Sequence, residues 1–78
     1  MKLTNLGSNK TEVTLNDGTV VFFSYHTPVA ACMGDGSGFV RTEKKWSVTT
    51  SKHINQWLEG AKAVSVDQSV LDSLSGAA

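Results

Sequence analysis

Residues 11–25 read TEVTLNDGTVVFFSY, and this stretch decides the fold because it describes a complete β-hairpin. Residues 16–18, Asn-Asp-Gly, form the turn, since Asn and Asp tolerate left-handed backbone angles and Gly adopts them without a Cβ clash. Residues 11–15 enter the turn with period-two alternation of apolar and polar side chains. Residues 19–25 leave it with β-branched and aromatic side chains on both faces, which is typical of a central strand.

The chain after this hairpin extends it into a meander. Pro28 lacks the backbone donor that an interior ladder position needs, so we expect a bend, a bulge or an edge at residues 26–28. Residues 29–33 resume as a strand, and the glycine-rich residues 34–38 form a flexible hairpin tip. Residues 39–46 form the return strand, whose alternation places Phe39, Arg41, Glu43 and Lys45 on one face and Val40, Thr42, Lys44 and Trp46 on the other, a pattern that Val48 can continue.

An amphipathic helix follows the return strand. Thr49 or Thr50 can cap its first turn, and Gly60 ends it in a left-handed conformation. Between these ends, apolar residues recur at i, i+3 and i+4, namely Ile54, Trp57 and Leu58. Residues 63–66 are compatible with a short fifth strand, and Asp67 can cap a last helical turn.

These elements predict an α+β fold for a single small domain at residues 1–78. It is a small antiparallel β-meander of four strands, or five with the short one. The sheet is strongly curved or packed against one amphipathic helix, and a short C-terminal helical turn follows. We expect residues 1–8 and 75–78 to be frayed. Because one helix covers one face only, either the sheet curls into a partial barrel or Val20 and Phe22 are left for a partner.

Composition excludes several classes of function. Seven basic and seven acidic residues cancel, so no global field steers the protein onto nucleic acid or an anionic membrane. The longest apolar run, residues 20–23, is far below the roughly 20 residues that cross a bilayer, and the first residues lack the apolar centre of a signal peptide. Cys32 is the single cysteine, which agrees with a reducing compartment. We therefore expect no membrane partner and a cytoplasmic location.

No motif for catalysis, a cofactor or a metal is visible. The glycines at 34–38 precede a strand, whereas a phosphate-binding loop precedes a helix, and Asp35 is too isolated for a calcium loop. His26, Cys32 and His53 lack zinc-like spacing, and nothing in their positions supports a Cys/His nucleophilic pair. We expect a protein that is not an enzyme and has no catalytic, cofactor or metal residues.

One segment, residues 41–53, has the composition of a nucleic-acid interface. Basic side chains that alternate with an aromatic ring can bind a phosphate backbone and stack a base, and the candidates are Arg41, Lys44, Lys45, Trp46 and Lys52. The competing interpretation is a solvated strand face with Trp46 in the core. We favour this second interpretation because strand alternation divides the charges between two faces.

Three segments together resemble a known group of sequences. They are residues 15–19 (LNDGT), residues 23–30 (FSYHTPVA) and residues 49–58 (TTSKHINQWL). In this pattern the chain resembles short uncharacterised proteins encoded by tailed bacteriophages and found in viral metagenomes, over about residues 2–74. The resemblance implies a phage origin and the cytoplasm of an infected host cell as the setting, and it implies no activity for any residue.

With that origin, the leading hypothesis is a small phage accessory protein that binds a host or phage macromolecule, in the first place a protein, and acts by occlusion. Its candidate anchors on the exposed sheet are Phe22, Tyr25, Arg41 and Lys45, because aromatic and Arg side chains dominate interface energetics. The second hypothesis is the nucleic-acid-binding module, and the third is a minor virion or assembly component. An unpaired sheet edge makes a homodimer plausible in all three.

Overall fold

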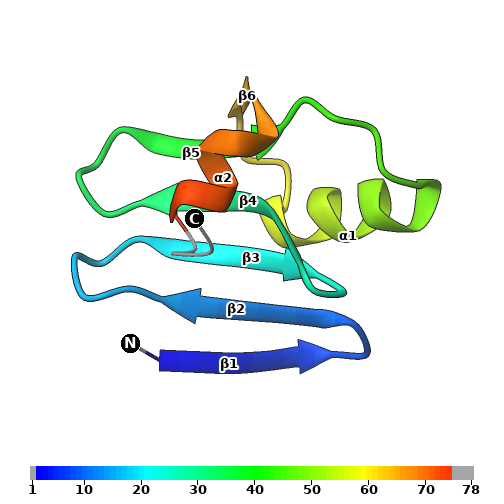
Figure 1. Cartoon of the computed structure of the whole chain (residues 1–78), viewed down its shortest axis with the longest axis horizontal. Helices are drawn as coiled ribbons and strands as arrows, with labels where there is room; N and C mark the ends of the chain where they lie inside the picture. Colours follow the sequence, from blue (N-terminus) through cyan, green and yellow to red (C-terminus); the bar gives the residue numbers. More distant parts are fainter. Residues whose placement is uncertain (1, 75–78) are drawn as a thin grey trace.

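The computed structural model describes residues 2–74 as one six-stranded sheet with two helices (Figure 1). The strands follow one another across the sheet in chain order. They are β1 (Lys2–Gly7), β2 (Lys10–Thr14), β3 (Val20–Ser24), β4 (Thr27–Met33), β5 (Gly38–Thr42) and β6 (Ala63–Val66). The helices are α1 (Val48–Leu58), between β5 and β6, and α2 (Gln68–Leu74), after β6.

The α+β class and the antiparallel meander are confirmed, but the predicted number of strands is wrong. Strands β1 to β5 pair antiparallel, and β6 pairs parallel to β5, since α1 carries the chain back across the sheet before β6 begins. The additional strand is β1, in a segment that we expected to be frayed; the expectation for residues 75–78 lies outside the described residues. The return strand ends at Thr42 instead of Trp46.

The hairpin of residues 11–25 has the predicted geometry. Gly18 adopts a φ of 90°, and the turn is closed by hydrogen bonds from the Leu15 N–H to the Thr19 carbonyl (2.7 Å) and from the Gly18 N–H to the Leu15 carbonyl (3.1 Å). The Asp17 carboxylate accepts a further hydrogen bond from the Thr19 N–H at 2.9 Å. Local turn chemistry therefore fixes the register of β2 against β3.

Pro28 lies within a central strand and is accommodated by an irregularity, as one of the predicted alternatives required. The pairing of β3 with β4 shifts between Phe22 and Phe23, and Pro28 stands opposite Phe23. The residue left without a partner is Val29, directly after Pro28, and proline is tolerated within a sheet at such an irregularity.

The glycine-rich tip at residues 34–38 packs against the neighbouring hairpin turn. The Gly34 N–H donates to the Thr19 hydroxyl at 2.9 Å. A Cβ at position 34 would lie 2.7 Å from the Thr19 nitrogen and 2.8 Å from the Gly18 carbonyl carbon, so only glycine allows this approach. The Asp35 carboxylate accepts from the Ser37 N–H at 2.9 Å, which gives the tip a polar contact of its own.

The two helices cover opposite faces of the sheet, and this arrangement replaces both alternatives predicted for the second face. On the α1 face, Phe22, Val29, Ala30, Ile54 and Leu58 form one buried cluster. On the α2 face, Val21, Ala31 and Leu71 form the other, with no exposed surface on any of the three. Figure 1 shows α2 lying over the middle of the sheet while β1 and β2 extend beyond both helices.

The cap of α1 differs from the prediction. Ser47, in extended conformation, is the N-cap, and its hydroxyl accepts a hydrogen bond from the Thr50 N–H at 3.1 Å. The helix ends at Leu58, after which Glu59 and Gly60 both have left-handed backbones with φ of 50° and 82°. Among the described residues, no helix has the length and apolar character that a membrane crossing requires.

Candidate functional site

Trp46 lies on the surface, in the loop between β5 and α1, and not in the core as we favoured from the sequence. Its side chain is 43% exposed. The strand ends at Thr42, so alternation no longer assigns the side chains of Glu43 to Trp46 to two faces. The argument that divided the basic residues between faces therefore fails beyond Arg41.

Hydrogen bonds connect the exposed Trp46 ring to the body of the protein. The indole N–H donates to the Gln68 side-chain oxygen at 3.1 Å, and the Gln68 amide donates to the Pro28 carbonyl at 2.7 Å. The Lys44 ammonium lies 4.0 Å from the centre of the Trp46 ring, a cation–π contact. Trp46 is thus an aromatic side chain held in place before any partner binds.

Three surface depressions meet at Trp46. The first, of about 220 Å³, also contacts Tyr25 and Thr50. The second, of about 470 Å³, joins Trp46 to three basic residues, Arg41, Lys44 and Lys45. The third, of about 410 Å³, includes Lys45 and Val48. We call the exposed region around these depressions the Trp46 surface, made of Tyr25, Arg41, Lys44, Lys45, Trp46 and Val48.

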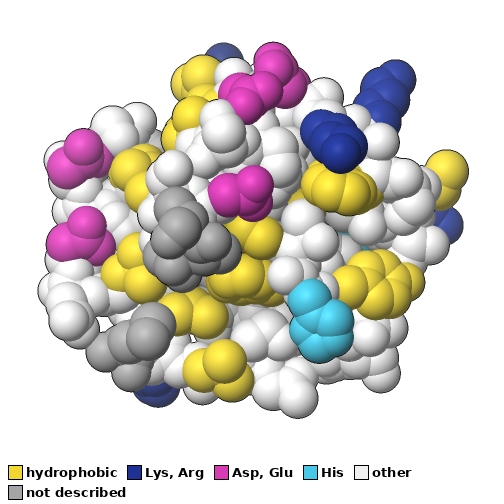
Figure 2. Space-filling model, viewed as in Figure 1, with side chains coloured by type: hydrophobic (Ala, Val, Ile, Leu, Met, Phe, Trp, Pro, Cys, Tyr) yellow, Lys and Arg dark blue, Asp and Glu magenta, His cyan; other side chains and the backbone are white. Residues whose placement is uncertain are grey.

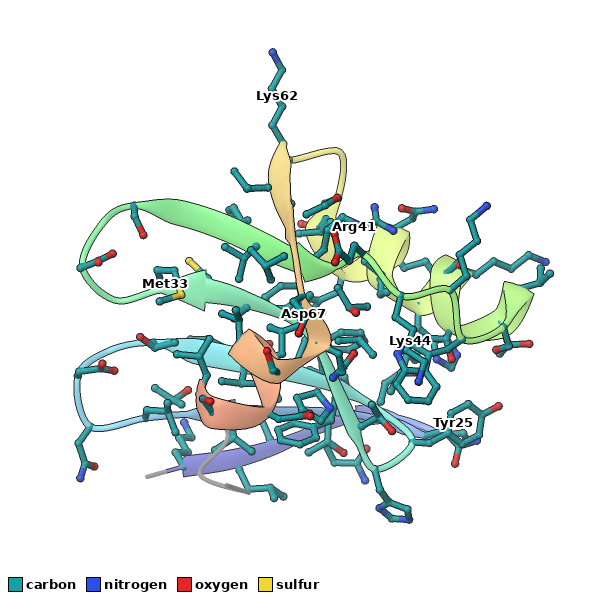
Figure 3. All side chains as sticks on the ribbon, turned by 45° about the horizontal axis from the view of Figure 1, so that its top comes forward. Tyr25, Met33, Arg41, Lys44, Lys62 and Asp67 are labelled. Carbon is teal, nitrogen blue, oxygen red and sulfur yellow. The ribbon has the colours of Figure 1, made fainter. Side chains whose placement is uncertain are left out.

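The Trp46 surface brings together most of the candidate residues from both sequence hypotheses. Figure 3 shows Arg41, Lys44 and Tyr25 along one side of the molecule. Figure 2 shows basic side chains on the right of the view beside an exposed hydrophobic patch, and acidic side chains mainly on the left and at the top. Lys52 is exposed on α1, outside the linings of the three depressions.

Phe22 is not available as a partner anchor. Its side chain has no exposed surface and belongs to the α1 core cluster. The prediction assumed that one face of β3 lacks a covering helix. In the structure, α1 covers one face and α2 covers the other. Tyr25, in contrast, is 47% exposed with a left-handed φ of 59°, and its ring centre lies 6.1 Å from that of His53.

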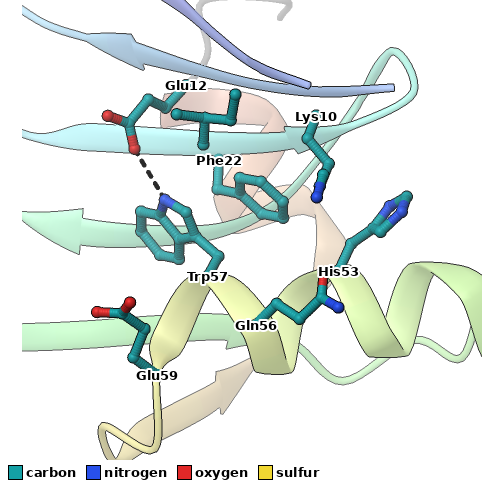
Figure 4. A pocket seen from close by; sticks show the side chains of 8 residues that line it. Lys10, Glu12, Phe22, His53, Gln56, Trp57 and Glu59 are labelled. Carbon is teal, nitrogen blue, oxygen red and sulfur yellow. Dashed lines mark hydrogen bonds between the residues drawn. The ribbon is translucent and has the colours of Figure 1, made fainter. Parts of the chain in front are cut away.

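A further depression, of about 320 Å³, lies between α1 and the β1–β2 part of the sheet (Figure 4). Trp57 stacks on Phe22 with 5.2 Å between ring centres, and its indole N–H donates to the Glu12 carboxylate at 2.8 Å. Next to this pair, His53 Nδ1 and the Ser24 hydroxyl lie 2.9 Å apart. These contacts join α1 to β2 and β3, so they serve the packing of the helix.

The histidines, the cysteine and the acidic residues form no metal-binding cluster in the described part of the chain. Within residues 2–74, no three His, Cys, Asp or Glu side chains lie close enough together to hold a metal ion. Cys32 is a free, half-buried thiol on β4, and His26 is exposed in the β3–β4 turn. The Ser37 hydroxyl and N–H lower the pKa of Asp35 below its usual value, and the Ser69 hydroxyl and N–H lower that of Asp67 in the same way. Each of these two carboxylates thus has a local partner.

Sequence reasoning missed two residues of this site. Val48, 76% exposed, is the first residue of α1, and Gln68 supports the Trp46 ring from α2. Val48 continues the apolar alternation of a strand, which hid its position on a helix. Gln68 lies 22 residues from Trp46, so local spacing carried no signal of the contact.

Comparison with known proteins gives one result. The model of DUF8033, a family of unknown function, matches residues 1–73. No curated protein and no solved structure shows a significant match. Since the family model covers nearly the whole sequence, the chain belongs to the DUF8033 family of unknown function.

Proposed function

We propose that the chain is a small non-catalytic binding protein of phage origin. It binds a macromolecule in the cytoplasm of the infected cell through the Trp46 surface, in the first place a host or phage protein. One observation carries the proposal: Trp46 is exposed, held in place, and shares depressions with Tyr25, Arg41 and Lys45, three of the four predicted anchors. Aromatic and Arg side chains around pre-formed hollows are the residues that dominate protein interfaces.

The charge of this surface indicates the chemistry of the partner. Arg41, Lys44 and Lys45 line one depression together with the single acidic residue Glu43. In Figure 2 the acidic side chains lie mainly on the left and at the top, and basic side chains lie on the right. The partner that complements the Trp46 surface is therefore an acidic protein surface with an apolar residue that packs against Trp46.

Affinity capture with two matched variants tests the proposal. Wild-type protein, Trp46→Ala and Val64→Ala are immobilised and exposed to lysate of a candidate host. Val64 is the control because it is an exposed apolar residue, 66% accessible, on β6. We expect a captured protein to be lost with Trp46→Ala, by at least tenfold, and kept with Val64→Ala. Capture of nothing by the wild type, or equal capture by all three, contradicts the proposal.

A single-stranded nucleic acid is the second candidate partner, and a specific observation favours it. The support for it is that four of its five candidate residues line one depression, namely Arg41, Lys44, Lys45 and Trp46. The Lys44 ammonium lies 4.0 Å from the centre of the Trp46 ring, and Arg41 and Lys45 line the same depression, so in this candidate the ring would stack a base beside three cations. This candidate requires that binding of labelled DNA or RNA weakens steeply with salt. The absence of binding at low salt, or binding that Trp46→Ala leaves unchanged, excludes it.

A further inference from the structure

The outer edge of β1 is the unprotected edge of the sheet. Within the described residues, β1 pairs with β2 alone, so its other side offers backbone N–H and C=O groups to a further strand. Edge strands are normally blocked by shortness, proline, a bulge or a charge near the middle. β1 has six residues and no proline, its one charge, Lys2, is at the first position, and its one irregularity lies near the end, between Asn5 and Gly7. The opposite edge, β6, has only four residues.

Apolar side chains stand on both faces beside this edge. Leu3, 71% exposed, lies on the α2 face, where it borders a depression of about 350 Å³ with Val13 and Phe23. Leu6, 41% exposed, lies on the α1 face, where it borders the depression that contains Trp57. A strand added to β1 therefore gains apolar contacts above and below the sheet as well as backbone hydrogen bonds.

We propose that the partner of this edge is a second copy of the chain, paired antiparallel through β1 about a two-fold axis at Thr4. Directly opposed side chains in a sheet lie on the same face, and side chains alternate between faces along a strand. In a pair of identical strands, an odd-numbered residue therefore faces an odd-numbered one and an even-numbered residue an even-numbered one. The axis at Thr4 uses the regular part of β1, where Leu3 pairs with Asn5 and Thr4 with Thr4 of the second copy. Lys2 then stands opposite Leu6, at the irregularity. The proposal goes beyond the binding function and does not depend on it.

Charge and symmetry favour a second copy as the occupant. The two Lys2 residues lie at opposite ends of the paired strands, so no like charges face each other, and opposed threonines are a favourable cross-strand pair. Each β1 edge covers an identical edge, so the assembly closes at two copies without leaving another β1 edge open. Pairing of five residues buries less surface than a standard interface of about 1,200–2,000 Å². The dimer therefore dissociates on dilution.

Sedimentation of opposite charge variants tests the pairing. Thr4→Lys and Thr4→Glu each place two like charges at the two-fold axis, so each variant alone is expected to stay monomeric where the wild type dimerises. An equimolar mixture restores the dimer, a rescue that a mere loss of fold cannot produce. Ser65→Lys, on the opposite edge, is the matched control and keeps the wild-type association. Trp46→Ala also dimerises, which separates this test from that of the proposed function.

Cysteine cross-linking tests the register. In a Cys32→Ser background, Thr4→Cys is expected to form an intermolecular disulfide on mild oxidation, and Ser65→Cys is expected to form at least tenfold less. A wild type that stays monomeric up to about 1 mM overturns the proposal. Two other results also overturn it. One is an unchanged dimer of Thr4→Lys, since the interface then lies elsewhere, and the other is binding of a foreign peptide to β1 instead of a second copy.

Discussion

Phe22 and Tyr25 lie three positions apart and have opposite roles, one in the core and one on the surface. Removing a fully buried aromatic side chain leaves a cavity, so Phe22→Ala is expected to lower the free energy of unfolding by about 3–5 kcal/mol. Tyr25→Ala, at a half-exposed position, should change it by no more than about 0.5 kcal/mol. Urea denaturation followed by circular dichroism measures both. Equal losses of unfolding free energy in the two variants would contradict the assignment of Phe22 to the core and Tyr25 to the surface.

At this scale the sequence predicts residue character better than residue position. The turn at residues 16–18 depends on its own backbone and was predicted correctly. Phe22 is buried because it packs against Ile54 and Leu58 of α1, which lie more than 30 residues later in the chain. The position of the Trp46 ring depends on its hydrogen bond to Gln68. Such tertiary contacts leave no trace in local spacing, so two candidate site residues were misplaced.

The N-terminus of α1 is controlled by one side chain. The Ser47 hydroxyl accepts from the Thr50 N–H, so Ser47→Ala is expected to lower the free energy of unfolding by about 0.5–2 kcal/mol. Thr49→Ala is the matched control, since Thr49 is exposed within the helix and alanine is the better helix former. Thermal and urea unfolding compare the two variants. A larger loss with Thr49→Ala would favour Thr49, one of the two caps predicted from the sequence, over Ser47.

The start of α2 has a carboxylate cap that titrates. Hydrogen bonds from Ser69 lower the pKa of Asp67 below its usual value of 3.8. Because the pKa is lower in the folded state, the stabilisation is complete above the unfolded pKa and is lost as the pH falls through the folded pKa. Asp67→Asn keeps an acceptor but does not titrate, so its unfolding free energy should fall less between pH 5 and pH 3. Urea unfolding of the wild type and of Asp67→Asn at pH 5 and pH 3 measures the difference. An identical pH dependence of the two proteins contradicts the role of Asp67 as a titrating cap.

Elements that carry a strong internal pattern were predicted, and those without one were not. β2, β3, α1 and the C-terminal helical turn have alternation, helical spacing or caps in their own residues. β1 has only Leu3 and Leu6 as apolar markers, three positions apart, a spacing that does not mark a strand. Its strand conformation comes from pairing with β2, a contact that single-strand patterns do not record.

At the scale of the whole molecule, a sheet with two apolar faces needs a cover on each. The prediction counted one helix and therefore left the second face to curvature or a partner. The seven residues of α2 are sufficient because Leu71 alone lies completely buried against Val21 and Ala31. Both helices cover the middle of the sheet, and among the described residues the loop around Trp46 and the edge of β1 are the exposed surfaces on which the two proposals rest.

This architecture makes Leu71 as important for the fold as a residue of the longer helix. Leu71→Ala removes the centre of the α2 face and is expected to lower the free energy of unfolding by about 2–5 kcal/mol. Val70→Ala, in the same helix and at a 43% exposed position, should change it by no more than about 0.5 kcal/mol. Urea denaturation of both variants measures the difference, and binding of a hydrophobic dye reports the uncovered face. If the sheet instead closed on itself as a partial barrel, the two variants would unfold alike.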